Sequence, residues 1–162
     1  MNKETRPIQH FGARSHWGRT GPRPARRLHR SFPATAVEVT AFLSDFILRT
    51  GAWTADRARL DDAELVLAEI LNNIVEHGST GPDTMVEITL VFDATRIRAE
   101  VVDNGAALPL ACLLDSGLPR MEPGIRNLPE GGFGWFMIHQ IAGDIAYEHV
   151  GGQNRLIFSI PL

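Results

Sequence analysis

The stretch from Glu69 to His77 constrains the fold most, because it places three of its five polar side chains in line among Ile, Leu and Val residues of a helical segment. Glu69, Asn73 and His77 follow one another at intervals of four residues. On an α-helix each such step advances about 40° around the axis, so the three side chains form one narrow stripe. Buried polar groups cost free energy unless something satisfies them. Hydrogen bonds to neighbouring loops would do so, and so would a bound metal ion with a polyanionic ligand.

An apolar strand follows this helix and ends in Asp103-Asn104-Gly105. A carboxylate at the end of a strand can accept a hydrogen bond from an exocyclic amine of a ligand. The same three residues are also an ordinary turn sequence, because Asp and Asn side chains bond to the nearby backbone and Gly permits the bend. The residues alone leave both interpretations open.

A cluster of glycines then opens an apolar helix further along the chain, at Gly131, Gly132 and Gly134. Glycines at a helix N-terminus let backbone N–H groups approach phosphate oxygens, and the helix dipole favours negative charge there. They would equally allow Phe133 and Trp135 to pack closely. The preceding residues, 106–130, lack clear periodicity, and a loop this long in a compact domain is usually functional or mobile.

Two helices are expected before the Asp103 strand. Thr35 and Glu38 form a capping-box pattern, and the apolar residues after them recur at helical spacing. Gly51 is expected to end this helix in the left-handed conformation. The second helix, which carries the polar stripe, is expected to begin at a cap on Asp61 and to end at Gly78.

Strand patterns occupy much of the remaining chain. Residues 85–92 and 96–102 are rich in β-forming residues and are predicted to pair as a hairpin around the turn 93–95. Residues 28–32 alternate weakly between apolar and polar, which indicates an edge strand.

A third helix is predicted from residue 133 to about residue 147. Gly151-Gly152 then joins a last hairpin that ends at residues 155–160. Together these elements predict an α+β two-layer sandwich, with helices on one face of a mixed, mostly antiparallel sheet.

Charge is distributed unevenly along the chain. The formal net charge of the 162 residues is −3, yet residues 1–30 carry eight basic groups against one acid. We expect residues 1–27 to form a flexible basic arm and residues 28–162 to form one domain. The arm would be a solvated leader, or an interaction tail that contacts an acidic surface. Nucleic-acid binding is not favoured, because the arm contains no recognisable reading motif.

The sequence gives no sign of membrane insertion or export. It contains no run of eighteen or more apolar residues, which a transmembrane helix would need. No secretory apolar region follows Met1. Cys112 is the single cysteine, so an intramolecular disulfide is excluded and a reducing compartment is compatible. We expect a cytoplasmic protein.

Taken in order, the polar helix, the strand ending in Asp103 and the glycine-rich helix start resemble the GHKL ATPase superfamily. This is the Bergerat-type nucleotide fold shared by gyrase, histidine kinases and mismatch-repair ATPases. The segments LAEILNNIVEHG, VVDNG and PEGGFGWFMIHQIAGDIAYEH are similar to the anti-sigma-factor serine/threonine kinase branch, whose members are small and cytoplasmic. The resemblance covers roughly residues 28–162.

The resemblance implies ATP and Mg²⁺ as ligands, and it assigns the base and phosphate contacts. Asp103 would hold the adenine N6 amine, with Gly105 in the same motif. The triphosphate would lie on a segment that includes Gly131, Gly132, Phe133 and Gly134. Arg126 or Arg120, the basic residues of the preceding loop, could neutralise the γ-phosphate, or both could be solvated loop charges.

The same resemblance assigns chemical roles to the three residues of the helical stripe. Asn73 matches the metal ligand of the family, and its side-chain oxygen suits Mg²⁺. Glu69 would act as the catalytic base that takes a proton from a hydroxyl nucleophile. His77 would support the structure or contact phosphate, because one His without nearby Cys or His makes a poor zinc site.

Two positions depart from the family pattern. Members usually show Asp-x-Gly-x-Gly, but Ala107 stands at the second glycine. Some relatives place an Arg immediately before the glycine cluster, where this chain has Glu130. Both departures bear on nucleotide affinity.

The predicted function is that of an ATP-dependent protein serine/threonine kinase that phosphorylates a small antagonist protein of the anti-anti-sigma type and sequesters a sigma factor. The alternative is a regulatory adaptor or anti-sigma protein that keeps the fold with little or no kinase activity. A histidine-kinase fragment is less favoured, because no upstream helical hairpin carries a phosphoacceptor His. The resemblance also implies a homodimer through the first helix and first strand.

Overall fold

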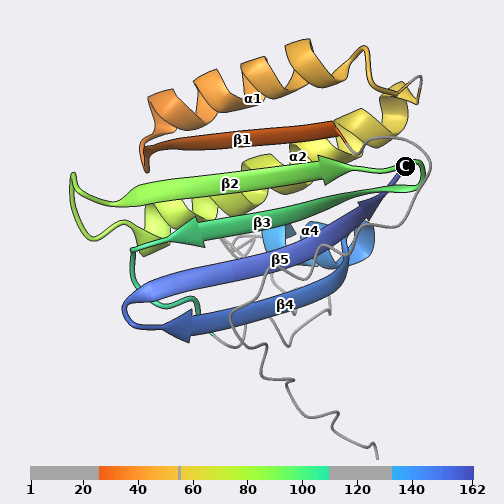
Figure 1. Ribbon diagram of the computed structural model, residues 1–162. Helices are drawn as coiled ribbons and strands as arrows, with labels where there is room; N and C mark the ends of the chain where they lie inside the picture. The colour runs from red at the N-terminus through yellow and green to blue at the C-terminus, as the bar shows by residue number, and fades with distance from the viewer. Residues whose placement is uncertain (1–25, 55, 110–132) are drawn as a thin grey trace, which may run out of the picture.

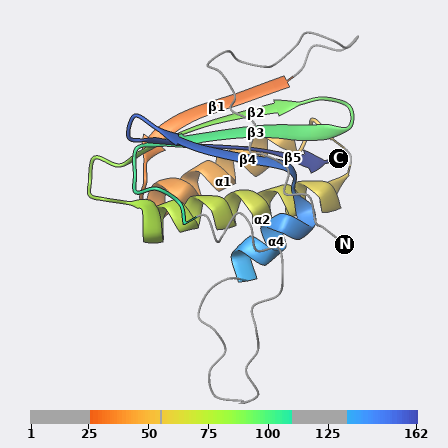
Figure 2. The same ribbon diagram turned by 90° about the horizontal axis from the view of Figure 1, so that it is seen from below.

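The computed structural model describes residues 26–54, 56–109 and 133–162. These residues form one five-stranded sheet with helices packed against one of its faces, as Figures 1 and 2 show. The predicted α+β two-layer architecture is therefore confirmed.

The sheet has the strand order β1-β2-β3-β5-β4, and its four ladders are all antiparallel. The strand β3 lies at the centre of the sheet, where main-chain hydrogen bonds join it to a strand on each side. The predicted edge strand and the predicted hairpin are both present. The strands are β1 (Arg26–Pro33), β2 (Met85–Phe92), β3 (Arg96–Asp103), β4 (Gly143–Val150) and β5 (Gln153–Pro161).

The helical layer consists of α1, α2 and α4, and α2 continues directly into a π-helical turn, η1. In Figure 2 the helices all lie on the same side of the sheet. Their bounds are α1 (Ala36–Thr50), α2 (Arg57–Asn73), η1 (Ile74–Gly78) and α4 (Phe133–Ile141). No helix in these described ranges is long and apolar enough to span a bilayer.

The core lies between the two layers. Alternate residues of the central strands, such as Leu90 and Ile97, have no exposed surface and face apolar residues of the helices, such as Phe46 and Leu67. Burying each such side chain contributes about 1.5–3 kcal/mol. Because successive side chains of a strand point to opposite faces, the other side chains form the second face of the sheet, which none of the described helices covers.

Helix ends match the predictions only in part. Thr35 caps α1 by accepting a hydrogen bond from the Glu38 N–H at 3.3 Å, as predicted. Gly51 has a φ of −58°, so the expected left-handed conformation is wrong. The α2 cap is also wrong: Asp56 accepts from the Arg59 N–H at 3.2 Å, and the helix begins about a turn before Asp61. Both Asp residues suit a cap, so the pattern did not distinguish them.

The helix predicted from residue 133 to residue 147 is much shorter in the structure. It ends at Ile141, and Gly143 begins β4, the other edge strand. Tyr147 pairs with Leu156 of β5 rather than lying on a helix. Strand pairing along β5 overrides the helical spacing of this short apolar segment, and Gly151-Gly152 forms the turn of the β4–β5 hairpin with positive φ at both residues.

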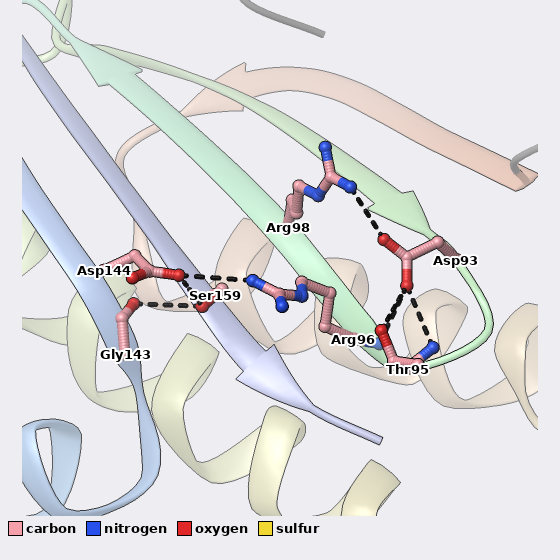
Figure 3. A network of polar contacts seen from close by, with 7 residues as sticks. All are labelled: Asp93, Thr95, Arg96, Arg98, Gly143, Asp144 and Ser159. Carbon is pink, nitrogen blue, oxygen red and sulfur yellow. Dashed lines mark hydrogen bonds and ion pairs between the residues drawn. The ribbon is translucent and has the colours of Figure 1, made fainter. Parts of the chain in front are cut away.

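The turn between β2 and β3 is organised by Asp93 (Figure 3). Its Oδ1 accepts hydrogen bonds from the Thr95 and Arg96 N–H groups at 2.9 and 3.0 Å, and its Oδ2 accepts from Arg98 at 2.9 Å. Partial burial raises the pKa of Asp93, but the bonds from Thr95 and Arg98 outweigh it and hold the pKa below its ordinary value of 3.8. The carboxylate therefore stabilises the fold more when it is ionised than when it is protonated.

We predict that Asp93→Ala lowers the free energy of unfolding at pH 7 by about 1–2 kcal/mol, because several hydrogen bonds lose their acceptor. Asp93→Asn keeps an acceptor oxygen and should lose less. A folded-state pKa below 3.8 means that the carboxylate contribution is full above about pH 4 and is lost as the pH falls through the lowered value. Urea unfolding of the three proteins between pH 3 and pH 7 tests this. A constant difference between wild type and Asp93→Ala over that range would contradict it.

Candidate functional site

One pocket lies where the end of α2, the turn η1, the residues after β3, α4 and the β4–β5 hairpin meet. Its volume is about 190 Å³, far more than one water molecule needs. The walls are mainly apolar, and the few polar side chains come from separate elements, which is typical of a small-molecule site. The lining residues are Ile70, Asn73, Ile74, His77, Gly78, Asp103, Ala106, Ala107, Leu108, Pro109, Trp135, Tyr147, Asn154 and Leu156.

Asp103 provides the carboxylate of this pocket. It is the last residue of β3 and is only 7% exposed. Its Oδ1 accepts hydrogen bonds from the Gly105 N–H at 2.8 Å and from Asn154 Nδ2 at 2.7 Å. No described residue donates a hydrogen bond to Oδ2. Among the described residues every fully buried side-chain oxygen has a partner, so Oδ2 must keep some accessible surface. It can therefore accept a hydrogen bond from a ligand in the pocket.

Asn154 is the residue that sequence reasoning missed. It lies opposite Asp103 in the β3–β5 ladder and opposite His149 in the β4–β5 ladder, and it is 4% exposed. Besides Asp103, its Nδ2 donates to the Ala106 carbonyl at 2.9 Å. A single Asn in a strand near the end of the chain carries no motif. Only the register of the sheet would have indicated it.

Tyr147 joins the same group of residues. Its hydroxyl donates to Asn154 Oδ1 at 2.7 Å and accepts from the Leu108 N–H at 2.8 Å. Burial raises the pKa of Tyr147, and the negative charge of Asp103 raises it further. The hydroxyl therefore stays protonated and keeps donating at neutral pH.

The polar stripe of the α2 segment meets this pocket through Asn73 and His77. Asn73 Nδ2 donates to the Glu69 carbonyl at 2.7 Å, which leaves its Oδ1 without a donor among the described residues. The helix changes from α to π directly after Asn73. Such π turns are frequent at functional sites, and here the turn brings the exposed side chain of His77 to the rim of the pocket.

Glu69 does not line the pocket. Its carboxylate lies against Gly134, near the start of α4, where a Cβ on Gly134 would collide with the Glu69 Oε2 oxygen. Gly134 leaves room for this carboxylate, because a larger residue there would require the Glu69 side chain to move. Phe133, the preceding residue, is partly exposed at the first position of the helix.

Gly105 allows a second close approach. The Ala106 N–H donates to the Gly78 carbonyl at 2.7 Å, which ties the residues after β3 to the end of η1. A Cβ on Gly105 would collide with that same carbonyl oxygen. The pocket floor thus depends on backbone contact between two segments that are far apart in sequence.

Comparison with known proteins identifies the fold family. The family described as "Histidine kinase-like ATPase domain" matches residues 30–160. The chain belongs to this family. The match agrees with the superfamily to which the helix, strand and glycine segments pointed.

Several curated relatives of this histidine kinase-like ATPase domain share one name. "Serine-protein kinase RsbW" of Bacillus cereus (strain G9842) is 29% identical over 101 residues, which cover 60% of this chain and 62% of the relative. The protein of the same name from Bacillus mycoides (strain KBAB4) matches with the same identity and coverage. These names agree with the serine-kinase branch, although the matched region spans less than two thirds of each relative.

A solved structure supports the fold alone. The crystal structure of the RsbU and RsbW domains of Rv1364c from Mycobacterium tuberculosis has a TM-score of 0.55 and 18% sequence identity. The match covers 85% of this chain and 32% of that chain.

The structure brings together only some of the predicted site residues of this histidine kinase-like ATPase domain. Asn73, His77 and Asp103 line one pocket, Gly105 supports Asp103, and Gly134 meets Glu69. Arg126, Gly131 and Gly132 lie outside the described residues, as do Arg120, Cys112, Glu130 and residues 1–25 of the basic arm. Among the described residues, no group of three or more His, Cys, Asp or Glu could hold a metal ion.

We predict that Gly105→Ala lowers the free energy of unfolding by about 1–3 kcal/mol, because backbone atoms of η1 cannot move aside for the added methyl group. Gly143→Ala is the matched control, because a Cβ there would lie 3.6 Å from its nearest neighbour, Ser159 Oγ. Thermal and urea unfolding of both variants provide the measurement. Equal stability of the two variants would contradict the close approach.

Proposed function

We propose that this chain binds Mg²⁺–ATP in the pocket beside Asp103 and transfers the γ-phosphate to a Ser or Thr of a small antagonist protein. It would act as an anti-sigma-factor kinase that also sequesters a sigma factor. The observation that supports this most is the meeting of Asn73, His77 and Asp103 on one pocket. The printed name of the relatives, a serine-protein kinase, supports the same reaction class.

The base would bind at Asp103. The pocket offers apolar walls, including Ile74 and Leu156, and one carboxylate oxygen that no described residue occupies. An adenine ring presents apolar faces and an exocyclic N6 amine, so it matches both features. The amine would donate to Oδ2 of Asp103, and this bond would select adenine over purines that lack the amine.

The residues present fit a magnesium ion at Asn73. Mg²⁺ takes oxygen ligands, keeps several waters, and needs few protein groups when phosphates are bound. Asn73 Oδ1 is such an oxygen, and the Nδ2 bond to the Glu69 carbonyl fixes which way the amide faces. When bound, the ion would neutralise phosphate charge.

Glu69, one helical turn before Asn73 and beside Gly134, would act as the general base. The Ser or Thr hydroxyl would give its proton to the Glu69 carboxylate as its oxygen bonds to the γ-phosphorus, and the bond to ADP would break. General bases of this kind typically contribute 10²–10⁴-fold in rate. Phosphoryl transfer otherwise needs positioning and charge neutralisation, which we assign to Asn73, His77 and the glycine segment.

The triphosphate would run from the base pocket toward α4. We propose that Gly131, Gly132, Phe133 and Gly134 supply backbone N–H groups to it, and that Arg126 neutralises the γ-phosphate. The position of Gly134 beside Glu69 supports this direction, because it would put the terminal phosphate near the proposed base.

A second candidate function is favoured by Ala107. This residue lines the pocket at the position where the family motif usually has a second glycine. A reduced affinity for ATP would leave a binding module that acts as an adaptor or anti-sigma protein. In either case we propose a cytoplasmic location, one domain over residues 28–162, and a homodimer.

We predict that Asp103→Asn and Glu69→Gln separate binding from chemistry. Asp103→Asn should raise the Kd for Mg²⁺–ATP about 10- to 100-fold, because the amine would lose a charged acceptor. Glu69→Gln should keep the Kd within about twofold and reduce γ-phosphate transfer by about 10²-fold or more. Titration calorimetry and transfer of labelled phosphate to an anti-anti-sigma-type protein, or to water, provide the measurements.

Asp61→Asn is the matched control, because Asp61 is exposed on the same helix, about two turns before Glu69 and outside the pocket lining, and it should change neither quantity. Absence of Mg²⁺–ATP binding at millimolar nucleotide would contradict the proposal and favour the adaptor. Binding without transfer, with Glu69→Gln equal to wild type, would contradict the kinase assignment alone.

A further inference from the structure

The amide of Asn154 uses all of its hydrogen-bonding capacity inside the protein. Its Nδ2 donates to Asp103 Oδ1 at 2.7 Å and to the Ala106 carbonyl at 2.9 Å. Its Oδ1 accepts from the Tyr147 hydroxyl and from His149 Nδ1, both at 2.7 Å. A carboxamide has two N–H donors and two lone pairs on oxygen. Asn154 therefore has nothing left to offer a ligand, although it lines the pocket.

The direction of every bond in this group follows from its acceptors. The Asp103 carboxylate and the Ala106 carbonyl can only accept, so they fix the Nδ2 end of the Asn154 amide. Asn154 Oδ1 must then receive the Tyr147 proton. The Tyr147 oxygen is left to accept from the Leu108 N–H at 2.8 Å.

These bonds connect two different parts of the proposed site. Leu108 and Ala106 belong to the residues that follow β3 and line the pocket, whereas Asp103 carries Oδ2, to which no described residue donates. The Asn154 amide holds both parts, and Tyr147 reaches it from the edge strand β4. A rotation of this amide would release the Asp103 carboxylate and the Ala106 carbonyl together, and it would remove the acceptor of the Tyr147 hydroxyl, which holds the Leu108 N–H.

We infer that Asn154 and Tyr147 are positioning residues for purine recognition: they hold Asp103 so that Oδ2 faces the base, and they couple this to the placement of residues 106–108. This inference rests on the proposed function. Neither residue would touch the nucleotide through a polar atom. Their effect would act through the carboxylate, so it should depend on whether the purine carries an exocyclic amine.

The test compares Mg²⁺–ATP with the Mg²⁺ complex of purine riboside triphosphate, which lacks the N6 amine. In wild type, ATP should bind about tenfold more tightly, which is the value of one hydrogen bond to a charged group. Tyr147→Phe should raise the Kd for ATP about three- to tenfold and bring the two Kd values about threefold closer together. A merely structural role for the hydroxyl would weaken both ligands equally and leave their ratio unchanged.

Ser159→Ala is the matched control. Ser159 pairs β5 with β4 through a buried hydroxyl that donates to Asp144 at 2.9 Å, on the uncovered face of the sheet (Figure 3). The substitution removes one hydroxyl from the same hairpin but outside the pocket, so it should leave the Kd values for both nucleotides unchanged. An unchanged Kd ratio in Tyr147→Phe, with ATP bound by wild type, overturns this inference alone. Failure of wild type to bind ATP overturns the proposed function and this inference together.

A spectroscopic measurement tests the same coupling while the Tyr147 hydroxyl is kept. Tyr147 is the single tyrosine of the chain, so 3-fluorotyrosine gives one ¹⁹F resonance. This resonance should shift as Mg²⁺–ATP saturates the protein, with the Kd found by calorimetry. Magnesium triphosphate without a base should leave it unchanged. A shift of equal size with both ligands would mean that the resonance does not report the base, and would overturn the coupling.

Discussion

A carboxylate buried at the end of a central strand has to be hydrogen-bonded, and the pocket is arranged around this requirement of Asp103. Its Oδ1 is satisfied by the Gly105 N–H and by Asn154. That solution works only when β3 and β5 pair in the register that sets Asp103 opposite Asn154. A slip of β5 by one residue would turn Asn154 to the other face of the sheet, away from Asp103. The register of the sheet and the geometry of the pocket are therefore one and the same constraint.

The second constraint is the close approach of backbone segments. Ala106 bonds to the Gly78 carbonyl beside Gly105, where a Cβ would collide with backbone atoms, and Gly134 of α4 lies against the Glu69 carboxylate. The change from α-helix to π-helix after Asn73 sets the position of that carbonyl. The helical segment that carries the polar stripe is thus tied to the residues after β3 by a main-chain hydrogen bond, for which Gly105 leaves the room.

Much of this arrangement could be predicted from local patterns, because periodicity and turn residues act over short distances. Thr35, the hairpin around Asp93, and the strand end at Asp103 were identified in this way. Predictions failed where tertiary pairing decided the outcome: residues 143–150 form β4 because they pair with β5. Asn154 was missed for the same reason, since its importance depends on its neighbours across two ladders and on no motif.

Different interactions form the two ends of the proposed nucleotide site. At the base end, Asp103, Asn154 and Tyr147 are held by paired strands, so the cost of ordering them is met during folding and not during binding. Selectivity among purines should therefore be a property of the folded sheet. At the phosphate end, the proposed contacts are charges and backbone donors of residues 126–134, whose attraction to a triphosphate does not depend on the base. Affinity and base selectivity should then vary independently, and Ala107, which lies between the two ends in sequence, can weaken the first without changing the second.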